Sequence, residues 1–377
     1  MSSCSYNIKT ITCHDVYNTG ASLQAFALSY YLKKLGHNIE IIDYKPEYLL
    51  HYQLWGVKNP KYDKPIIRIL YNILKLPQRI VERFSKRKRV FDQFTKEYLS
   101  LTKKKYTTNE ELKAENISAD IIFAGSDQIW NTVFQNGKDP AFYLDFASSK
   151  TICASYAASF ATEDIVDEYK AIVGTWLKKL NFVSVRESSG IDILKKLGIE
   201  NGCIVCDPVF LLSKDEWRSF AVNNNCAEKY LLIYDFDNND ELNQKAVYIA
   251  KENGWKIYSI FPNSICDRCC FNCGPLEFVG LIKDAEMIIS NSFHATAFSI
   301  IFEKHFLVFD RQEKINTRMR DLLVSLNIFD EKVIDYDKVN FLLNDYIENS
   351  KKYIDKVIAA VGDREDDSED FSDYTSL

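Results

Sequence analysis

One stretch decides the fold of this chain: Ala285-Glu-Met-Ile-Ile-Ser-Asn-Ser-Phe-His-Ala-Thr-Ala-Phe-Ser-Ile-Ile-Phe302. It begins with the apolar run Met287-Ile-Ile, typical of a buried strand, and ends with a run apolar enough for a buried helix. The polar turn between the two runs describes the carboxyl edge of a parallel sheet, where open α/β folds bind ligands. His294 lies where the helix begins, and free amides there favour anions. We therefore take His294 as a candidate catalytic residue; the alternative is a buried histidine with structural contacts only.

Length and charge limit the possibilities. A chain of 377 residues is long enough for two domains, each with its own core. The net charge of −6 argues against a nucleic-acid-binding protein. The sequence Met1-Ser-Ser-Cys-Ser5 lacks the charged and apolar regions of a signal peptide, and no apolar run is long enough for a membrane span. We expect a cytoplasmic protein whose ten cysteines are mostly free thiols.

The pattern of strand, polar turn and helix recurs in the first half. Residues 6–12 predict a strand, residues 21–35 a helix with Gly36 as its stop, and residues 37–43 a second strand. Asn18 and Gly20 lie in the loop before this helix. They are candidates for a ligand rim, although a simple capped turn explains the same residues.

Another buried strand, predicted at residues 119–124, ends at Gly125-Ser-Asp-Gln128, again a carboxyl-edge loop. Ser126, Asp127 and Gln128 offer hydrogen-bonding groups to a sugar or a phosphate. Trp130 follows closely; it can stack on a sugar ring, but a core position is the more common use of a buried tryptophan.

Basic side chains follow two further strands. Arg186 comes after the β-branched run Phe182-Val-Ser-Val185 and predicts either a clamp for carboxylate or phosphate, or a structural ion pair with Glu187 or Asp207. Beyond the strand predicted at residues 306–309 lie three more cations: Arg311, Lys314 and Arg318. They indicate a phosphate site, with a solvated rim as the alternative.

A basic segment interrupts the first half. Residues 68–105 contain twelve Lys or Arg and three acids. The run Ser85-Lys-Arg-Lys-Arg89 predicts a solvated helix face. The apolar residues threaded through it allow a second interpretation, a helix that meets an anionic membrane or a diphosphate-linked lipid.

A thiol-rich loop lies in the second half, Cys266-Asp-Arg-Cys-Cys-Phe-Asn-Cys273. Paired cysteines suggest zinc, but zinc sites place a longer spacer between the pairs. Because Cys269 and Cys270 are adjacent, four ligands from this loop would be strained. We expect no metal there.

Several short motifs occur in one order from about residue 17 to residue 326. They are Asn18-Thr-Gly20 with Leu23-Gln-Ala25, Gly125-Ser-Asp-Gln-Ile-Trp-Asn131, Ser155-Tyr-Ala-Ala-Ser-Phe160, Ser184-Val-Arg-Glu187, Asp207-Pro208 with Leu211-Leu212 and Trp217, Gly274-Pro275 with Phe278, Ser292-Phe-His294, and Asn316 with Arg318. Each motif is weak by itself, but together and in this order they are specific. With them the chain resembles the polysaccharide pyruvyl transferases.

The resemblance implies an α/β fold in which two Rossmann-like domains face a central cleft, as in glycosyltransferases of the B type. We expect an N-terminal domain at 1–210 with a basic helical insertion at about 68–105. A C-terminal domain is expected at 211–362, with a final helix that returns to the first domain. The acidic residues 363–377 are expected to form a disordered tail.

The resemblance also implies an activity. Phosphoenolpyruvate would be the donor, and a sugar with two nearby hydroxyls the acceptor of a cyclic pyruvate ketal. We expect His294 to protonate the donor's methylene carbon. The expected donor-binding residues, which must balance a carboxylate and a phosphate, are Arg186, Ser292, Phe293, Lys314 and Arg318. The expected acceptor-binding residues are Asn18, Gly20, Ser126, Asp127 and Gln128. The scheme requires no cofactor and no metal.

One departure from the family pattern bears on the donor site. Some relatives carry Arg-Leu-His where this chain has Ser292-Phe293-His294, so another cation must replace that arginine. Arg311, Lys314 and Arg318 are the candidates. We expect the acceptor to be linked to polyprenyl diphosphate, as a precursor of a capsular or other bacterial surface polysaccharide. Residues 68–105 would then meet the inner face of the cytoplasmic membrane.

Two rival functions come from other classes. A B-type glycosyltransferase would use a nucleotide-sugar donor and release a nucleotide. A non-catalytic protein would bind a sugar or phosphate in the same cleft, with His294 only donating or accepting a hydrogen bond.

Overall fold

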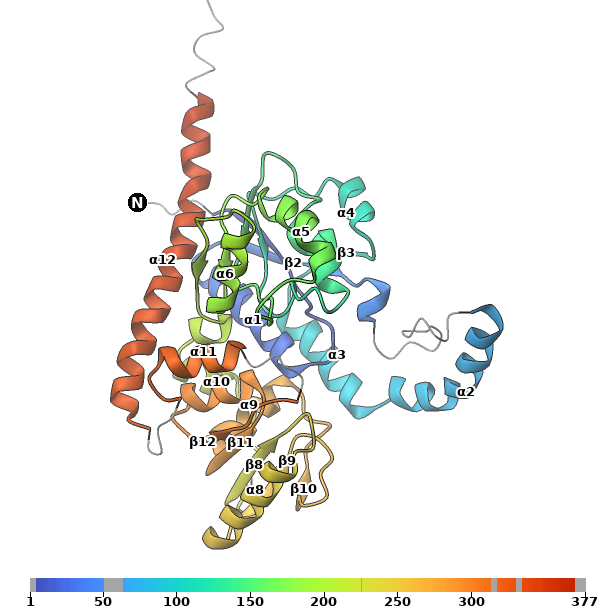
Figure 1. Ribbon diagram of the computed structural model, residues 1–377, viewed down its shortest axis with the longest axis vertical. Helices are drawn as coiled ribbons and strands as arrows, with labels where there is room; N and C mark the ends of the chain where they lie inside the picture. Colours follow the sequence, from blue (N-terminus) through green and yellow to red (C-terminus); the bar gives the residue numbers. More distant parts are fainter. Residues whose placement is uncertain (1–4, 51–63, 225, 313–316, 330–333, 370–377) are drawn as a thin grey trace, which may run out of the picture.

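The computed structural model describes residues 5–50, 64–224, 226–312, 317–329 and 334–369 (Figure 1). Within them the strands form two five-stranded parallel sheets and one two-stranded sheet. The first sheet has the order β3-β2-β1-β4-β5: β1 Asn7–Ile11, β2 Asn38–Tyr44, β3 Leu101–Tyr106, β4 Ile121–Ala124 and β5 Ile152–Ser155. The second has the order β10-β9-β8-β11-β12: β8 Tyr230–Tyr234, β9 Lys256–Ser259, β10 Arg268–Cys269, β11 Met287–Ser290 and β12 His305–Val308. The small sheet pairs β6 Ser184–Val185 with β7 Cys203–Ile204.

The two large sheets share one winding. In each, the first strand lies in the middle and the chain moves outward on one side before it crosses to the other. The strand order therefore reverses between β1 and β4, and again between β8 and β11. Such a switch point is where an open α/β sheet leaves a crevice for a ligand. The predicted α/β class with two Rossmann-like units is confirmed.

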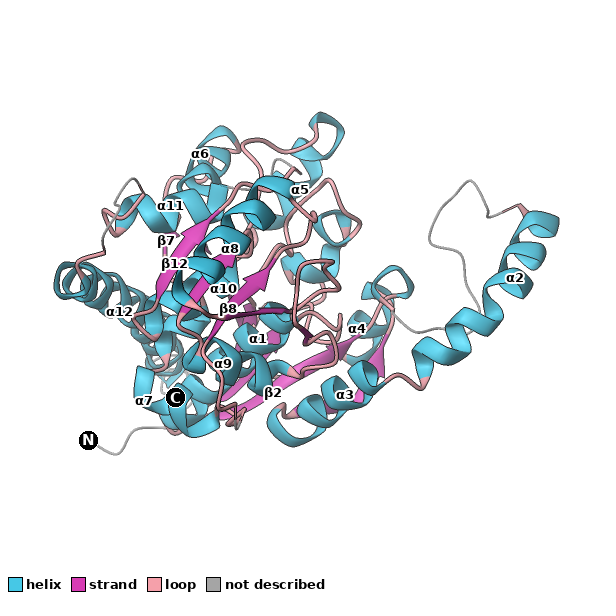
Figure 2. Ribbon diagram, turned by 90° about the horizontal axis from the view of Figure 1, so that it is seen from below, coloured by secondary structure: helices cyan, strands magenta, loops and turns pink. Residues whose placement is uncertain are grey.

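Helices cover both sheets (Figures 1 and 2). They are α1 Thr19–Lys34, α2 Pro65–Arg83, α3 Lys86–Tyr98, α4 Asn109–Glu115, α5 Lys170–Leu177, α6 Ser188–Lys196, α7 Lys214–Phe220, α8 Asp240–Asn253, α9 Pro275–Asp284, α10 Phe293–Ile301, α11 Thr317–Ser325 and α12 Tyr336–Glu369. Short 3₁₀ turns lie at Glu47–Leu49, Asn136–Lys138, Pro140–Tyr143, Asp167–Tyr169 and Pro208–Leu211. Ser213 and Glu216 form a capping box at the start of α7.

One of the apolar core clusters contains residues of both halves. The ring of Phe26 on α1 lies 5.8 Å from that of Trp217 on α7, and Trp217 lies 4.9 Å from Phe298 on α10. Trp217 is fully buried, and its indole N–H donates to the carbonyl of Val209 at 2.8 Å. Because this aromatic chain crosses from the first sheet's helices to the second's, it holds the two sheets in one arrangement.

The last helix joins both halves as well. α12 begins beyond the second sheet, runs along the side of the molecule and reaches the first (Figure 1). There the Tyr353 hydroxyl donates to the carbonyl of Ser155 at 2.7 Å, and the Cys206 amide donates to Ser350 Oγ at 2.8 Å. The helix continues through Glu369, so the disorder predicted from residue 363 onward is wrong for that part of the tail. Residues 370–377 lie outside the described residues.

The basic segment, residues 68–105, contains most of α2, all of α3 and the start of β3, so the insertion predicted as helical includes part of a strand of the first sheet. Its two helices have different surroundings. α3 packs on the body: Phe91 and Phe94 are buried, and so is Arg87. The Arg87 guanidinium donates to the carbonyls of Tyr17 and Phe271, one in each half of the chain. The predicted solvated face is therefore wrong for Arg87, because these two carbonyls hold its charge inside. α2 instead projects away from the body (Figures 1 and 2).

The thiol-rich loop forms the short edge strand β10, paired with β9. Its cysteines are free, and Cys269 is exposed. Across the described ranges, no three His, Cys, Asp or Glu side chains gather as a metal site would require. None of the described helices combines the length and the apolar character of a membrane span.

Candidate active site

A polar cavity of about 130 Å³ lies where the switch points of the two large sheets face each other. Its lining comes from the loops after β1, β4, β8, β11 and β12 and from α11: Asn18, Asp127, Gln128, Phe236, Asn291, Ser292, Phe293, His294, Arg311, Arg318 and Met319. All five loops leave the carboxyl ends of their strands. The fold therefore brings residues from both halves of the chain into one crevice.

His294 occupies the first turn of α10. Ser292 caps this helix by accepting from the amide of Ala295, as a residue at that position should. The amides of Phe293 and His294 belong to the first turn, whose N–H groups have no partner within the helix. Since the side chain of His294 lines the same cavity, an anion there would meet both the amides and the imidazole.

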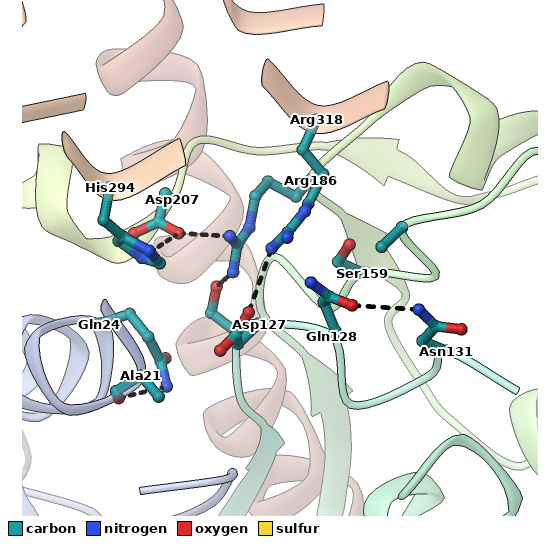
Figure 3. Close-up of polar contacts among 12 residues, drawn as sticks. Ala21, Gln24, Asp127, Gln128, Asn131, Ser159, Arg186, Asp207, His294 and Arg318 are labelled. Carbon is teal, nitrogen blue, oxygen red and sulfur yellow. Dashed lines mark hydrogen bonds and ion pairs between the residues drawn. The ribbon is translucent and has the colours of Figure 1, made fainter. Parts of the chain in front are cut away.

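Asp207 lies between His294 and Arg186. Its Oδ2 lies 3.5 Å from Nε2 of His294 and 2.9 Å from Nη1 of Arg186 (Figure 3). Oδ1 accepts from the amide of Val209 at 3.0 Å. Burial pushes the pKa of Asp207 upward, but the charges of Arg186 and then His294 outweigh it and lower that pKa to about 2. Asp207 is therefore an anion at any physiological pH, and it lies beside the imidazole of His294.

Arg186 is a buried structural cation beside the cavity. Of the two ion pairs considered for it, the one with Asp207 is present; Glu187 instead accepts from the amides of Phe160 and Ala161 at 2.9 Å. Arg186 also donates to the hydroxyl of Ser126. Ser126 is fully buried and does not line the cavity, so it positions Arg186 rather than an acceptor.

The ring of Phe293 lies close to two guanidinium groups. Its centre lies 5.1 Å from Cζ of Arg186 and 5.7 Å from Cζ of Arg318. A ring face attracts cations, which lets two like charges approach the same helix start. Phe293 also lines the cavity, and its predicted donor-binding role stays a prediction.

Arg318 and Asp127 link the two halves across the cavity. Arg318 Nη1 lies 3.1 Å from Oδ1 of Asp127 (Figure 3). Burial pushes the pKa of Asp127 upward, yet Arg318 and then Arg186 lower it below its usual value. Asp127 has a φ of 76°, an unusual conformation for a residue other than glycine. Strained backbone of this kind gathers at functional sites because the surrounding structure must enforce it.

The remaining residues predicted to bind the acceptor differ in their contacts. Asn18 and Gln128 line the cavity, but the side chain of Asn18 also caps α1 by accepting from Ala21, as the simple-turn interpretation predicted. Gln128 accepts from the side-chain amide of Asn131 at 3.1 Å. Trp130 is buried and stacks on Tyr143 with ring centres 5.5 Å apart. The structure therefore supports the interpretation of Trp130 as a core residue.

Of the three cations after β12, two line the cavity. They are Arg311 and Arg318. Arg311 lies over the ring of Phe236 at 4.6 Å and 3.5 Å from Asp237. Lys314 lies outside the described residues, so its donor-binding role stays a prediction.

Asp207 is the functional residue that sequence reasoning did not place in the site. It stands in the motif Asp207-Pro208 after β7, and its appearance as a possible partner of Arg186 was the only signal. The sequence also did not predict that Gly20 lies against the ring of His294. A Cβ built on Gly20 would lie 2.5 Å from Cε1 and Cγ of His294 and closer still to Nδ1. The absence of a side chain at Gly20 therefore leaves room for the imidazole, and its predicted acceptor-binding role stays a prediction.

This close approach leads to a test. We expect Gly20→Ala to push the imidazole out of position and to lower kcat by roughly a hundredfold, because misplacement of a reacting group by about 1 Å has that effect. The measurement is steady-state turnover at saturating substrate. Gly174→Ala on α5 is the matched control: its Cβ would meet Leu197 at an ordinary 3.5 Å, so activity should not change. Equal activity of the two variants would contradict the role given to Gly20.

Chemically, the arrangement suits an anion that must be protonated. Among the described side chains, the buried Nε atoms of Arg186 and Arg318 have no hydrogen-bond partner, while Nε2 of His294 faces Asp207 at 3.5 Å. A guanidinium has five N–H donors, so an ion pair with one carboxylate leaves donors for a ligand. The cavity thus combines anion donors, a helix start and an imidazole that an anionic carboxylate supports.

Comparison with known proteins agrees with this geometry. A family model described as polysaccharide pyruvyl transferase matches residues 18–313, which is most of the chain. The matched segment includes His294, Arg186 and Asp207, while Arg318 lies just beyond it. A search of curated proteins finds no match.

Solved structures share the fold at low identity. A structure from Listeria monocytogenes described as a UDP-N-acetylglucosamine 2-epimerase is 10% identical, with a TM-score of 0.50 over 94% of this chain and 91% of that one. UDP-GlcNAc 2-epimerase from Neisseria meningitidis bound to UDP-GlcNAc is 10% identical, with a TM-score of 0.49 over 94% and 99%. Arabidopsis thaliana UGT89C1 is 9% identical, with a TM-score of 0.44 over 95% and 100%. At such identities, the likeness concerns the fold alone.

Proposed function

Because this chain belongs to the polysaccharide pyruvyl transferase family, we propose that it transfers the pyruvyl unit of phosphoenolpyruvate to two hydroxyls of a sugar. The product is a cyclic pyruvate ketal, and phosphate is released. The observation that carries the proposal is the cavity between the two sheets. His294, Arg318 and the start of α10 converge there, in a space of about 130 Å³.

The donor's charges match this convergence. Phosphoenolpyruvate carries a carboxylate and a phosphate, and the proposal places them against Arg318, Arg311 and the first-turn amides of α10. Each arginine already has a carboxylate neighbour, Asp127 and Asp237 respectively. Those neighbours fix the guanidinium planes before the donor arrives, which reduces the reorganisation that binding requires.

In the proposed reaction, His294 donates a proton to the methylene carbon of the donor. The central carbon then becomes electrophilic, and the first sugar hydroxyl adds to it as the enol double bond is consumed. Asp207 stabilises the imidazolium before transfer. Phosphate leaves with its bridging oxygen, and the second hydroxyl closes the ketal. One hydroxyl hydrogen ends on the new methyl group, through His294, and the other ends on phosphate.

The acceptor side of the proposal rests on Asn18, Gln128 and Asp127, which border the cavity from the first sheet. Amide and carboxylate oxygens suit sugar hydroxyls. We propose that the acceptor sugar is carried on polyprenyl diphosphate at the cytoplasmic face of the membrane, as a precursor of a surface polysaccharide.

The experiment is a product assay with phosphoenolpyruvate and a lipid-linked galactoside. We expect phosphate release that depends on the acceptor, and a product heavier by one ketal-linked pyruvate. If this galactoside fails, a panel of other sugars follows. Nucleotide release from a sugar nucleotide, with no phosphate release across the panel, would replace the proposal by a glycosyltransferase. Bound phosphoenolpyruvate without turnover across the panel would indicate a binding protein.

A further inference from the structure

α2 exposes one long apolar face. Its members, called here the α2 face, repeat at helical spacing and include Phe84 just after the helix: Ile66, Leu70, Ile73, Leu74, Ile80, Val81 and Phe84. All are exposed, with Leu74 at 78%, Ile66 at 75% and Val81 at 72%. Both ribbon views show α2 projecting from the body (Figures 1 and 2). A contiguous exposed patch of this kind marks an interaction surface rather than ordinary surface chemistry.

The opposite side of α2 is basic. Arg68, Lys75, Arg79 and Arg83 fall on the turn of the helix away from the α2 face, and Glu82 is the one acid within the helix. Lys86 and Arg89, at the start of α3, are also exposed. The whole chain nevertheless has a net charge of −6. Positive charge is therefore concentrated where the apolar side chains are exposed.

The apolar face and the basic side of α2 together indicate the kind of partner that the helix binds. An apolar face with a row of Lys and Arg behind it suits an interfacial helix, whose side chains enter the lipid while its cations contact anionic headgroups. A second copy of α2 would satisfy the apolar face but would bring two basic helices together. We propose that α2 lies in the plane of an anionic lipid surface and inserts the α2 face into it.

α3 connects α2 to the residues that line the cavity. Arg87 on α3 donates to the carbonyl of Tyr17, and the Tyr17 hydroxyl donates to Asp92 on the same helix at 2.9 Å. The next residue, Asn18, lines the cavity. A docked α2 would therefore hold the acceptor side of the cavity near the lipid surface. Only this placement of the acceptor rests on the proposed function; the docking itself does not.

The test is vesicle flotation of the full chain. Vesicles of phosphatidylglycerol and phosphatidylethanolamine are compared with vesicles of phosphatidylcholine. The variant carries Ile66→Ser, Leu70→Ser and Leu74→Ser, and the matched control carries Val247→Ser, Tyr248→Ser and Phe341→Ser, which are exposed apolar residues elsewhere. We expect the α2 variant to partition into anionic vesicles at least about tenfold more weakly, because three apolar side chains no longer leave water. The control should bind as the wild type does.

A charge variant tests the second half of the proposal. Lys75→Gln with Arg83→Gln should weaken binding to anionic vesicles and reduce its salt dependence. Equal binding to phosphatidylcholine would overturn the anionic specification. No vesicle binding by the wild type would overturn the proposal, as would a dimer that the α2 variant dissociates.

Turnover on a soluble acceptor separates the two proposals. The α2 variant should keep wild-type turnover with a soluble sugar and lose it selectively with acceptor embedded in vesicles. Vesicle binding without turnover by any form would remove the proposed function and leave the docking proposal standing.

Discussion

Replacement of His294 by Gln should lower kcat for pyruvyl transfer by about two to four orders of magnitude, the usual contribution of a general acid. Glutamine keeps a polar side chain at the first turn of α10 and leaves the Ser292 cap in place. It cannot deliver a proton to carbon. The thermal midpoint should change little, because Asp207 keeps its pair with Arg186 at 2.9 Å. The measurement is acceptor-dependent phosphate release at saturating phosphoenolpyruvate, together with thermal unfolding.

His305→Gln provides the matched control for this prediction. His305 is exposed at the amino end of β12, on the sheet edge opposite the cavity loops. Its replacement by Gln is therefore the same chemical change outside the site. Its activity should equal that of the wild type. If His294→Gln retained more than about a tenth of the wild-type kcat, the proton would have to come from another group.

Replacement of Arg186 by Leu should destabilise the protein by about 3–5 kcal/mol, the usual effect of leaving one partner of a buried ion pair uncompensated. Asp207 would remain in the interior without its main counter-charge, and Ser126 would lose its donor. Phosphoenolpyruvate turnover should fall as well, since His294 depends on the position of Asp207. Denaturant unfolding gives the stability, and saturating-substrate kinetics give kcat.

The stability difference should depend on pH in a defined direction. In the wild type, the folded-state pKa of Asp207 is about 2, below its unfolded value of about 3.9. This depressed pKa contributes stability that is full above pH 4 and disappears as pH falls from 4 to 2. Without Arg186, burial raises the pKa of Asp207, so the variant lacks this contribution. The difference between wild type and variant should be largest at neutral pH and shrink on acidification through that window.

The same substitution at a surface pair is the matched control. Arg218 lies 2.9 Å from Asp215 on α7, and both side chains are more than half exposed. Arg218→Leu should change stability by less than about 1 kcal/mol, because solvent screens such pairs. Equal effects of the two substitutions would show that the Arg186–Asp207 pair contributes no more than an exposed one.

The stretch that holds His294 shows how far local pattern reaches. Met287–Ser290 and Phe293–Ile301 became a strand and a helix, with the polar turn between them at the carboxyl edge. Alternation of apolar runs and polar turns is a local property, so the β and α elements and their ligand-facing ends could be predicted from sequence. Asn18, Asp127 and His294 were placed at such ends, and the cavity joins them.

Composition did not predict which side chains of the basic segment are buried, because burial depends on the neighbours that the fold supplies. The basic segment reads as one charged run, yet α3 buries Arg87 against two carbonyls while α2 exposes its apolar face. A charge count gives no information on which carbonyls will surround a side chain. The domain boundary predicted at residue 210 stays a prediction.

The sequence by itself determined the class of fold, the edges at which ligands bind and the candidate proton donor, because these follow from periodicity and from residue chemistry. The tertiary structure alone decided which loops meet. Asp207, Arg186 and His294 come from three separate segments. Arg186 and Asp207 meet because β6 pairs with β7, and His294 reaches Asp207 because the two halves of the chain pack together. Coulomb attraction and steric exclusion act over a few ångströms. Only the folded chain fixes such distances between residues so far apart in sequence.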